Sequence, residues 1–189
     1  FLFTLYQFTP NLINLSDFKF FLPFWCHFFI EPNQQTLVFF FWFNTFNRTG
    51  IYFHSAVPPS ANYQVSADFV VFDDDNVALV GLLGRLDTTL FTCYRIRYVL
   101  SSNTWQLTKI VNNVGTILGT LVESLSVGVH PVVLSMNGDQ IKASRDGAEI
   151  ISATNSDITA AGKSGVYFVN ATPAGGHNIH IDNFSAVSV

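Results

Sequence analysis

Hydrophobic and polar residues alternate along most of the chain from residue 63 onward, with the period of two that is typical of β-strands. Tyr63–Phe72 shows this alternation and ends at a polar turn. The two faces of residues 89–100 separate as Phe91, Cys93, Arg95 and Arg97 against Leu90, Tyr94, Ile96 and Tyr98. This segment is therefore expected to be a strand with one apolar face and one mixed face.

Short segments of the same kind stand between turn residues throughout the rest of the chain. Further strands are expected in residues 77–86, 104–111, 114–122, 131–136, 140–144, 148–153, 164–170 and 177–189. Asn137-Gly138 and Asp146-Gly147 are dipeptides that favour two-residue hairpins, because the central residues of such turns take positive φ. No window supports a helix longer than one turn, so the pattern predicts an all-β sandwich or barrel of antiparallel strands.

The segment Leu37–Phe43 breaks the alternation, because it is apolar at both odd and even positions. A strand of this kind is buried on both faces, as in the middle of a sandwich or between two subunits. Residues 1–46 hold 14 of the 20 Phe residues. We therefore expect a Phe-rich N-terminal arm, residues 1–46, and a β-sandwich domain, residues 47–189.

An extended aromatic arm would aggregate if it were left in water, so it needs a partner surface. It can fold back on its own sandwich, or it can insert into a neighbouring subunit and extend that subunit's sheet. A head-to-tail exchange that does not close builds a filament. The leading hypothesis is a non-enzymatic subunit of an extracellular homopolymer. The expected assembly residues are Phe20, Phe21, Phe24, Trp25, Leu37, Phe39, Phe40, Phe41, Trp42 and Phe43.

Charge and hydropathy exclude several classes of partner. The net charge of −4 gives no basic footprint for nucleic acid. The longest apolar runs fall short of the roughly 18 to 20 residues that cross a bilayer, so no membrane span is expected. Cys26 and Cys93 are too few for a disulfide framework or a zinc site. They form either one disulfide between arm and domain or two buried thiols.

From residue 51 to residue 189, the order of features resembles a known group of domains. The matching segments are "VSADFVV", "VGLLGRL", "YRIRYV", "WQLTKIV", "VVLSMNGDQIKASRDGAEI", "SDITAAGKSGVYF" and "HIDNFSAV". They resemble the concanavalin A-like lectin and glucanase group of jelly-roll sandwiches, which includes laminin-G-type domains. The resemblance implies a jelly-roll fold but little about function, because such folds host many activities. It supports a second hypothesis, a carbohydrate-binding module or virion surface protein in which Tyr residues, Trp105 and loop Asp and Asn residues contact sugar.

Glycoside hydrolysis needs two carboxylates that flank the scissile bond. Glucanases that the sequence resembles carry a closely spaced pair of Glu residues on one strand. The three glutamates, Glu31, Glu123 and Glu149, do not fall at that spacing. The sequence therefore predicts no enzyme, and no cofactor is expected.

Two other kinds of site remain open. Asp73, Asp74, Asp75 and Asn76 form either a calcium site at a loop tip or a solvated turn between strands. His177 and His180 are three residues apart on an expected strand, so they point to opposite faces and do not share a metal. Sequons for N-glycosylation occur at Asn14, Asn47 and Asn170, which would carry glycans in a secreted protein of a suitable cell.

Overall fold

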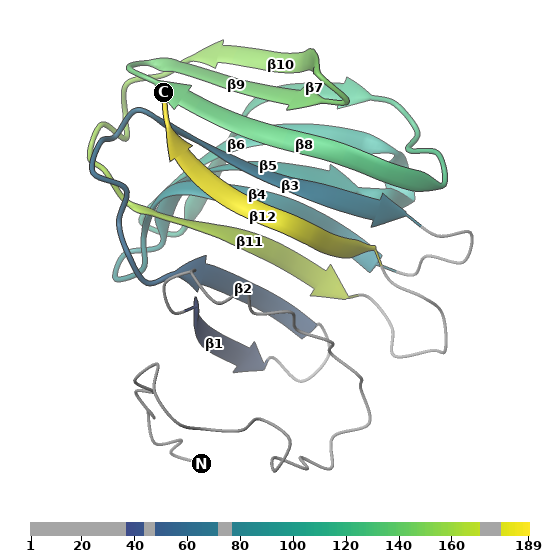
Figure 1. Ribbon diagram of the computed structural model, residues 1–189, viewed down its shortest axis with the longest axis horizontal. Helices are drawn as coiled ribbons and strands as arrows, with labels where there is room; N and C mark the ends of the chain where they lie inside the picture. Colours follow the sequence, from purple (N-terminus) through teal and green to yellow (C-terminus); the bar gives the residue numbers. More distant parts are fainter. Residues whose placement is uncertain (1–36, 44–47, 72–76, 171–178) are drawn as a thin grey trace. The chain divides into compact units, whose positions relative to one another are not determined.

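The computed structural model describes residues 37–43, 48–71, 77–170 and 179–189, which form two antiparallel sheets (Figure 1). The seven-stranded sheet contains, in spatial order, β1 (Leu37–Phe43), β2 (Arg48–His54), β11 (Lys163–Asn170), β4 (Val77–Asp87), β5 (Thr92–Val99), β6 (Thr104–Val111) and β7 (Val114–Val122). The five-stranded sheet contains β10 (Ala148–Thr154), β9 (Gln140–Arg145), β8 (Gly128–Asn137), β3 (Tyr63–Val71) and β12 (His180–Ser188).

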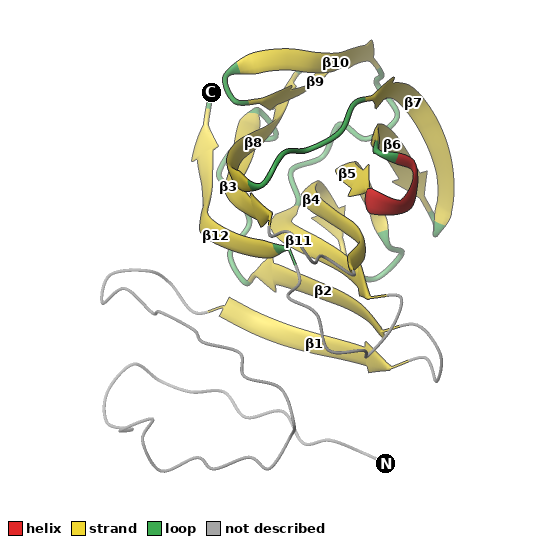
Figure 2. Cartoon of the chain, turned by 90° about the vertical axis from the view of Figure 1, so that its right-hand side faces the viewer, coloured by secondary structure: helices red, strands yellow, loops and turns green. Residues whose placement is uncertain are grey.

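The chain crosses repeatedly between the two sheets. β3 lies in the five-stranded sheet although β2 and β4 both lie in the other, and β11 returns to a place between β2 and β4. Figure 2 shows the two layers that result. In the described part of the chain the sole helical element is the short 3-10 turn η2 (Leu100–Ser102). The all-β jelly-roll sandwich expected from the sequence is confirmed.

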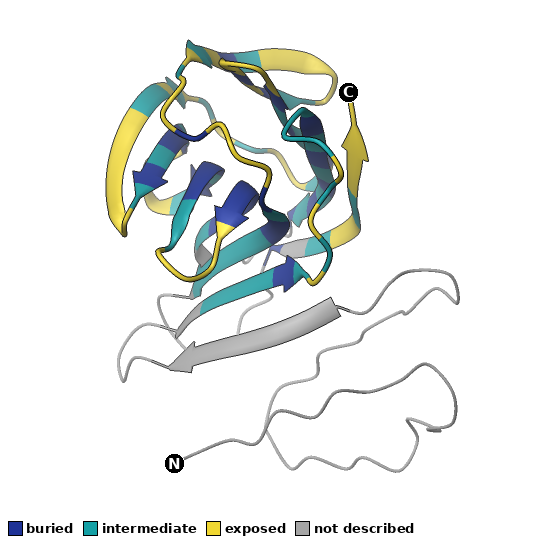
Figure 3. Cartoon of the chain, turned by 90° about the vertical axis from the view of Figure 1, so that its left-hand side faces the viewer, coloured by how far each residue is buried: buried dark blue, intermediate teal, exposed yellow. Residues whose placement is uncertain are grey.

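The core lies between the inner faces of the sheets, where the alternation places its apolar residues. Trp105 of β6 is fully buried and stacks on Phe69 of β3, with 6.1 Å between the ring centroids. Tyr98 of β5 packs beside it at 5.0 Å. Large aromatic side chains dominate the energy of such a core because each buries about 150 to 250 Å². Figure 3 shows that burial is greatest in the middle strands of the sheets.

The tyrosine hydroxyls that enter this core are hydrogen-bonded, whereas the ring nitrogen Nε1 of Trp105 is buried without a partner in the described part of the chain. The Tyr63 hydroxyl donates to the Gly162 carbonyl at 3.0 Å, and the Tyr94 hydroxyl lies 2.7 Å from the amide oxygen of Asn155. The Tyr98 hydroxyl donates to the Asn103 side chain at 2.9 Å and accepts the backbone N–H of Leu125 at 3.1 Å. These bonds tie the ends of the strands to the loops.

Arg85 is an unusual core residue, because it is only 2% exposed and forms no ion pair with a carboxylate of the described residues. Its guanidinium donates to the carbonyl oxygens of Ala61, Ile158 and Gly138, at 2.9, 2.6 and 2.9 Å. A register shift between Gly84 and Asp87 in β4 accompanies the positive φ of 50° at Arg85. Arg85 therefore joins three loops at one end of the sandwich.

The hairpin turns follow the expected chemistry with one shift in position. Asp146 and Gly147 both have positive φ, 51° and 80°, and they form the two-residue turn between β9 and β10. In the preceding hairpin the loop is Gly138-Asp139, because Asn137 still belongs to β8. Only Gly138 of that loop has positive φ, so the turn lies one residue later than the Asn-Gly dipeptide suggests.

The aromatic segment Leu37–Phe43 forms β1, with the bounds that the sequence predicts. It pairs antiparallel with β2 of its own chain, from Leu37 opposite His54 to Phe43 opposite Arg48. Its side chains are not described, so the expected burial of both faces stays a prediction, as does pairing with another copy. Phe20, Phe21, Phe24 and Trp25 lie outside the described residues.

Within the described residues, no helix has the length and apolar character needed to cross a bilayer.

Candidate functional site

The outer face of the seven-stranded sheet carries a group of polar side chains in its middle. Arg95 and Arg97 of β5 point away from the core, because Tyr94, Ile96 and Tyr98 take the inward positions. In the register of the sheet, Thr108 stands opposite Arg95 and Gln106 stands opposite Arg97. Tyr167 of β11 reaches the same face from the other side of β4. We call Arg95, Arg97, Gln106, Thr108 and Tyr167 the arginine cluster.

Arg97 is held by a neutral partner. Its Nε and Nη2 atoms donate to the side-chain oxygen of Gln106, at 2.8 and 2.6 Å. Arg95 is held by an aromatic ring, since its guanidinium lies 4.7 Å from the centroid of Tyr167. Both arginines are thus oriented by neighbours that leave their positive charge uncompensated.

Two polar atoms of the arginine cluster are buried without a partner. Arg95 is 7% exposed and Thr108 is 3% exposed. Arg95 Nε and Thr108 Oγ1 make no hydrogen bond within the described part of the chain. An unsatisfied buried polar group costs roughly 1 to 3 kcal/mol, so proteins rarely keep one without a use. The other three members of the cluster, Arg97, Gln106 and Tyr167, are half-buried.

Electrostatics at Arg95 reflect the same lack of a counter-charge. Burial lowers the pKa of its guanidinium, and the neighbouring charge of Arg97 lowers it further. The ring hydroxyl of Tyr167 raises the pKa of Arg95, but by less than these two effects lower it. A ligand group that stabilised the charged guanidinium of Arg95 would carry negative charge or accept hydrogen bonds.

A second, smaller cluster of buried apolar side chains adjoins the arginine cluster on the side of the seven-stranded sheet that faces away from the main core. It consists of Phe53, Leu83, Leu86, Cys93 and Ile110, each at most 5% exposed. Cys93 is a free thiol, which favours the interpretation of buried thiols over a disulfide with Cys26. Burial raises the pKa of Cys93 to about 12, so the thiol stays neutral and is a poor nucleophile.

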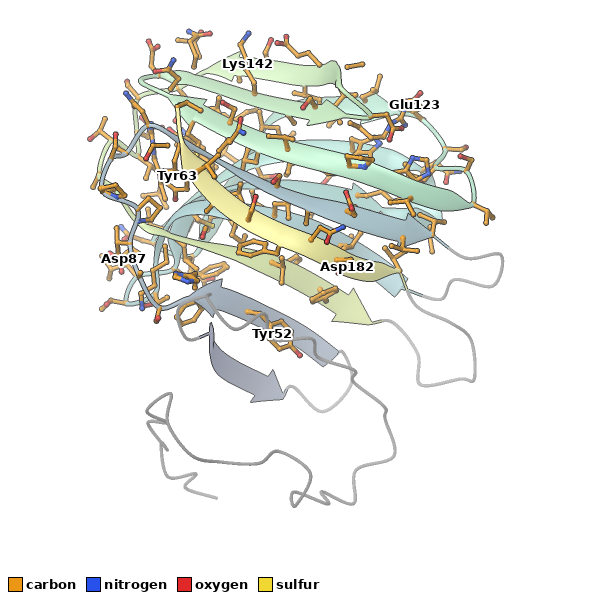
Figure 4. All side chains as sticks on the ribbon, in the orientation of Figure 1. Tyr52, Tyr63, Asp87, Glu123, Lys142 and Asp182 are labelled. Carbon is orange, nitrogen blue, oxygen red and sulfur yellow. The ribbon has the colours of Figure 1, made fainter. Side chains whose placement is uncertain are left out.

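A second candidate is a hollow of about 400 Å³ at one end of the sandwich. Its polar lining includes Asp87, Thr88, Asp157 and Lys163, and Figure 4 shows Asp87 at this end. The carboxylates here already have partners. Asp87 accepts the backbone N–H of Thr89 at 2.8 Å, and Asp157 forms an ion pair with Lys109. The carboxylates that line this hollow are therefore less available to a ligand than the unpartnered atoms of the arginine cluster.

A third candidate brings together Ser126, His130 and Asp146, the residue types of a serine hydrolase. His130 Nδ1 lies 3.0 Å from Asp146 Oδ2. His130 Nε2 lies 2.8 Å from the backbone carbonyl oxygen of Ser126 but 3.5 Å from its hydroxyl. Because a carbonyl can only accept, Nε2 is a donor here and is unsuited to remove a proton from the hydroxyl. The three residues instead connect the β7–β8 loop to the β9–β10 turn.

The structure corrects one sequence-based expectation and leaves others outside its reach. Trp105 is fully buried in the core, so the prediction that it contacts sugar is wrong. The calcium candidate, Asp73 to Asn76, and the sequon residues Asn14 and Asn47 lie outside the described residues. Asn170 is the last residue of β11. A fourth sequon begins at Asn183, whose side-chain amide donates to Asp68 at 2.7 Å.

Within the described residues, no group of three or more His, Cys, Asp or Glu side chains is arranged to hold a metal ion.

The arginine cluster was not among the sites predicted from sequence, although a signal for part of it was present. The alternation in residues 92–99 already places Arg95 and Arg97 opposite the apolar face. Two arginines on the outward face of a central strand are a reason to suspect a ligand. Tyr167 had no such signal, because it reaches the cluster only through the crossover that inserts β11 beside β4.

Comparison with protein-family models and with curated protein sequences finds no match. The fold is similar to that of several solved structures. A carbohydrate-binding module, CBM66 from Bacillus subtilis, matches with a TM-score of 0.59 at 14% identity, over 80% of this chain and 98% of that one. Sheep galectin-11, in complex with glycerol, matches with a TM-score of 0.51 at 8% identity, over 72% and 96% of the two chains.

A Caenorhabditis elegans galectin, LEC-6, is similar as well. Its TM-score is 0.50 at 11% identity, and the match covers 77% of this chain and 94% of that one. Identities this low establish the fold alone. The described part of the chain is a concanavalin A-like jelly-roll sandwich.

Proposed function

We propose that this protein is a carbohydrate-binding module without catalytic activity, and that the arginine cluster on the outer face of the seven-stranded sheet binds the glycan. The observation that carries the proposal is the pair of unpartnered buried atoms, Arg95 Nε and Thr108 Oγ1. Sugar hydroxyls both donate and accept hydrogen bonds, so one sugar ring can satisfy a guanidinium N–H and a threonine hydroxyl together.

The similarity to a carbohydrate-binding module and to galectins supports the same class of function, although it concerns the fold only. The glutamates support binding without hydrolysis. Glu123 pairs with Arg145 and Glu149 pairs with Lys142, so neither belongs to the arginine cluster. Glu31 lies outside the described residues. An extracellular location, where glycans are abundant, is part of this proposal.

Binding of the labelled full chain to a glycan array tests this function. The test variants are Arg97→Ala and Gln106→Ala, because both side chains are half-buried and their removal leaves the core intact. Lys142→Ala is the matched control. It also removes a long polar side chain, but from β9 of the other sheet (Figure 4).

We expect the wild-type chain and Lys142→Ala to bind the same glycans, and we expect each cluster variant to bind them about tenfold more weakly, as loss of one charge-assisted hydrogen bond implies. Two results would contradict the proposal. One is no binding by the wild-type chain to any glycan, and the other is equal binding by all variants.

The assembly hypothesis stays a separate prediction. It depends on residues 1–36, which lie outside the described residues, and on the side chains of β1. Because β1 already pairs with β2 of its own chain, the glycan-binding function is the better supported of the two. Deletion of residues 1–36 tests assembly directly, since loss of polymers in electron micrographs is expected only if that segment joins subunits.

A further inference from the structure

Charge is distributed unevenly between the two sheets. The strands of the seven-stranded sheet contain six of the nine Lys and Arg residues of the chain and one of its thirteen Asp and Glu residues. That one acidic residue is Asp87, the last residue of β4. The other sheet carries Asp68, Glu149 and Asp182 on its strands. A chain with a net charge of −4 thus has one strongly basic sheet.

The two cluster arginines lie in the middle of this basic sheet and have no acidic partner. Arg95 and Arg97 form none of the ion pairs in the described part of the chain, which involve Lys109, Lys142, Arg145 and His130. β5, β6 and β11, which supply the whole arginine cluster, contain no Asp or Glu. Nothing within these strands can neutralise the two guanidinium groups.

Arg85 shows how this protein stabilises a buried guanidinium that serves structure alone. Its Nε and both terminal nitrogens each donate to a backbone carbonyl oxygen, so all three nitrogens are engaged. Arg95 is almost as deeply buried, yet within the described residues its Nε has no acceptor and it joins no ion pair. A buried charge without a counter-charge is unfavourable unless its N–H groups are fully hydrogen-bonded. The difference indicates that the missing acceptor at Arg95 comes from outside the chain.

We propose that the glycan bound by the arginine cluster is acidic, and that its carboxylate or sulfate group is held by Arg95 and Arg97. This inference rests on the proposed function and narrows it to one class of ligand. Guanidinium groups present N–H donors in a plane that matches a carboxylate or sulfate, and such bonds are about twice as strong as neutral ones. The Thr108 hydroxyl would donate to the same anion or to an adjacent sugar oxygen. Tyr167 holds the Arg95 guanidinium in place from the other side.

Isothermal titration of the full chain with matched sugars tests the charge preference. Oligogalacturonate and its methyl ester differ in the carboxylate, which esterification makes neutral, and sulfated and desulfated keratan oligosaccharides differ in the sulfate on a chain that has no uronic acid. Comparison of the two pairs distinguishes the two anions. We expect the acidic member of at least one pair to bind about tenfold more tightly than its neutral match. Raising the salt concentration should weaken that binding, because added ions screen partly exposed charges.

Variants then assign the preference to the cluster. Arg95→Met keeps the length of the side chain but removes its charge, and Arg97→Met does the same at the more accessible position. Each should reduce the ratio between acidic and neutral sugar to about one, whereas Lys142→Met should leave it unchanged. Thermal unfolding confirms that each variant is folded, and Arg97→Met keeps the test valid if Arg95→Met is not.

The outcomes separate this inference from the proposed function. If acidic and neutral sugars bind equally and Arg97→Met weakens both, the cluster binds glycans but the acidic preference is wrong. If no sugar in the titrations or on the glycan array binds, both proposals fail. If the preference survives in both cluster variants, it arises elsewhere and this inference is wrong.

Discussion

The two faces of the seven-stranded sheet differ in the kind of polar group that they bury. On the inner face, the hydroxyl groups of Tyr94 and Tyr98 each have a hydrogen-bond partner. On the outer face, two atoms of the arginine cluster are buried without a partner among the described residues. One inner-face atom of the described residues, Trp105 Nε1, is also buried without a partner, but it lies inside the apolar core. Arg95 Nε and Thr108 Oγ1 are the unpartnered atoms that a ligand on the outer face would satisfy.

Truncating the largest inner-face side chain should have the greatest effect on stability. Trp105→Ala removes a fully buried ring that packs against both sheets, and we expect the free energy of unfolding to fall by about 3 to 5 kcal/mol. On the outer face, Tyr167→Ala should lower the free energy of unfolding much less, because this ring is only half-buried. The same variant should lose glycan binding. Urea unfolding followed by circular dichroism measures both. Equal losses of stability would show that the two faces do not differ.

The two buried arginines should respond oppositely to the same substitution. Arg85→Met leaves three carbonyl oxygens without donors and should lower the free energy of unfolding by at least about 3 kcal/mol. Arg95→Met removes a charge that has no counter-charge, so its effect should be neutral or stabilising. Parallel denaturant titrations of the two variants measure the difference. A strongly destabilised Arg95→Met protein would mean that Arg95 serves the fold.

High pH should destabilise the fold through buried acidic groups on both faces. Burial raises the pKa of Cys93 from 9.0 to about 12 and that of Tyr63 from 10.0 to about 12. Both groups favour their neutral forms when folded, so the stability they contribute is complete below about pH 9. It is lost as the pH rises towards 12, because the unfolded chain releases these protons earlier.

Thermal unfolding between pH 8 and pH 11 measures this loss, and the variant Cys93→Ala should show a smaller one. In the variant Cys26→Ser, which leaves Cys93 as the single thiol, a thiol reagent at pH 8 should react only after unfolding. Rapid reaction in the native protein would contradict the burial of Cys93.

A matched pair of threonines on β6 gives the smallest and most specific effect. Thr104 donates a hydrogen bond to the Ser102 carbonyl at 2.9 Å, so Thr104→Val should lower the free energy of unfolding by about 1 kcal/mol. Among the described residues the Thr108 hydroxyl has no partner, so Thr108→Val should raise the free energy of unfolding by a similar amount and weaken glycan binding. Chemical denaturation of the two variants measures whether the free energy of unfolding falls or rises in each. A loss of stability in both variants would mean that the Thr108 hydroxyl is satisfied in the free protein.

The regular parts of this fold could be predicted because local signals there agree with the tertiary structure. β6 and β7 have the bounds that alternation predicts, and the Asp146-Gly147 turn has the positive φ values that its residues favour. The position of Arg85 could not be predicted from local sequence signals. The register shift in β4 takes it out of the simple alternation, and its three acceptors come from loops far away in sequence.

The candidate site could be predicted only in part from the sequence, because its residues come from strands that are separated in the chain and adjacent only in the folded sheet. The arginines of β5 were visible as an outward-facing pair, but their lack of a counter-charge depends on which strands lie beside them. Trp105 was misassigned for the same reason. An aromatic residue in a strand looks alike in sequence whether it faces sugar or core, and only the sheet pairing shows which face is covered.

The central claim, that the outer face of the seven-stranded sheet binds the glycan, is tested most directly by hydrogen–deuterium exchange of the full chain with and without a bound acidic oligosaccharide. The account predicts slower exchange in peptides that contain β5, β6 and β11, and no change in peptides that contain β8 and β9 of the other sheet. Slower exchange confined to the five-stranded sheet, or to the end loops around Asp87 and Asp157, would contradict it.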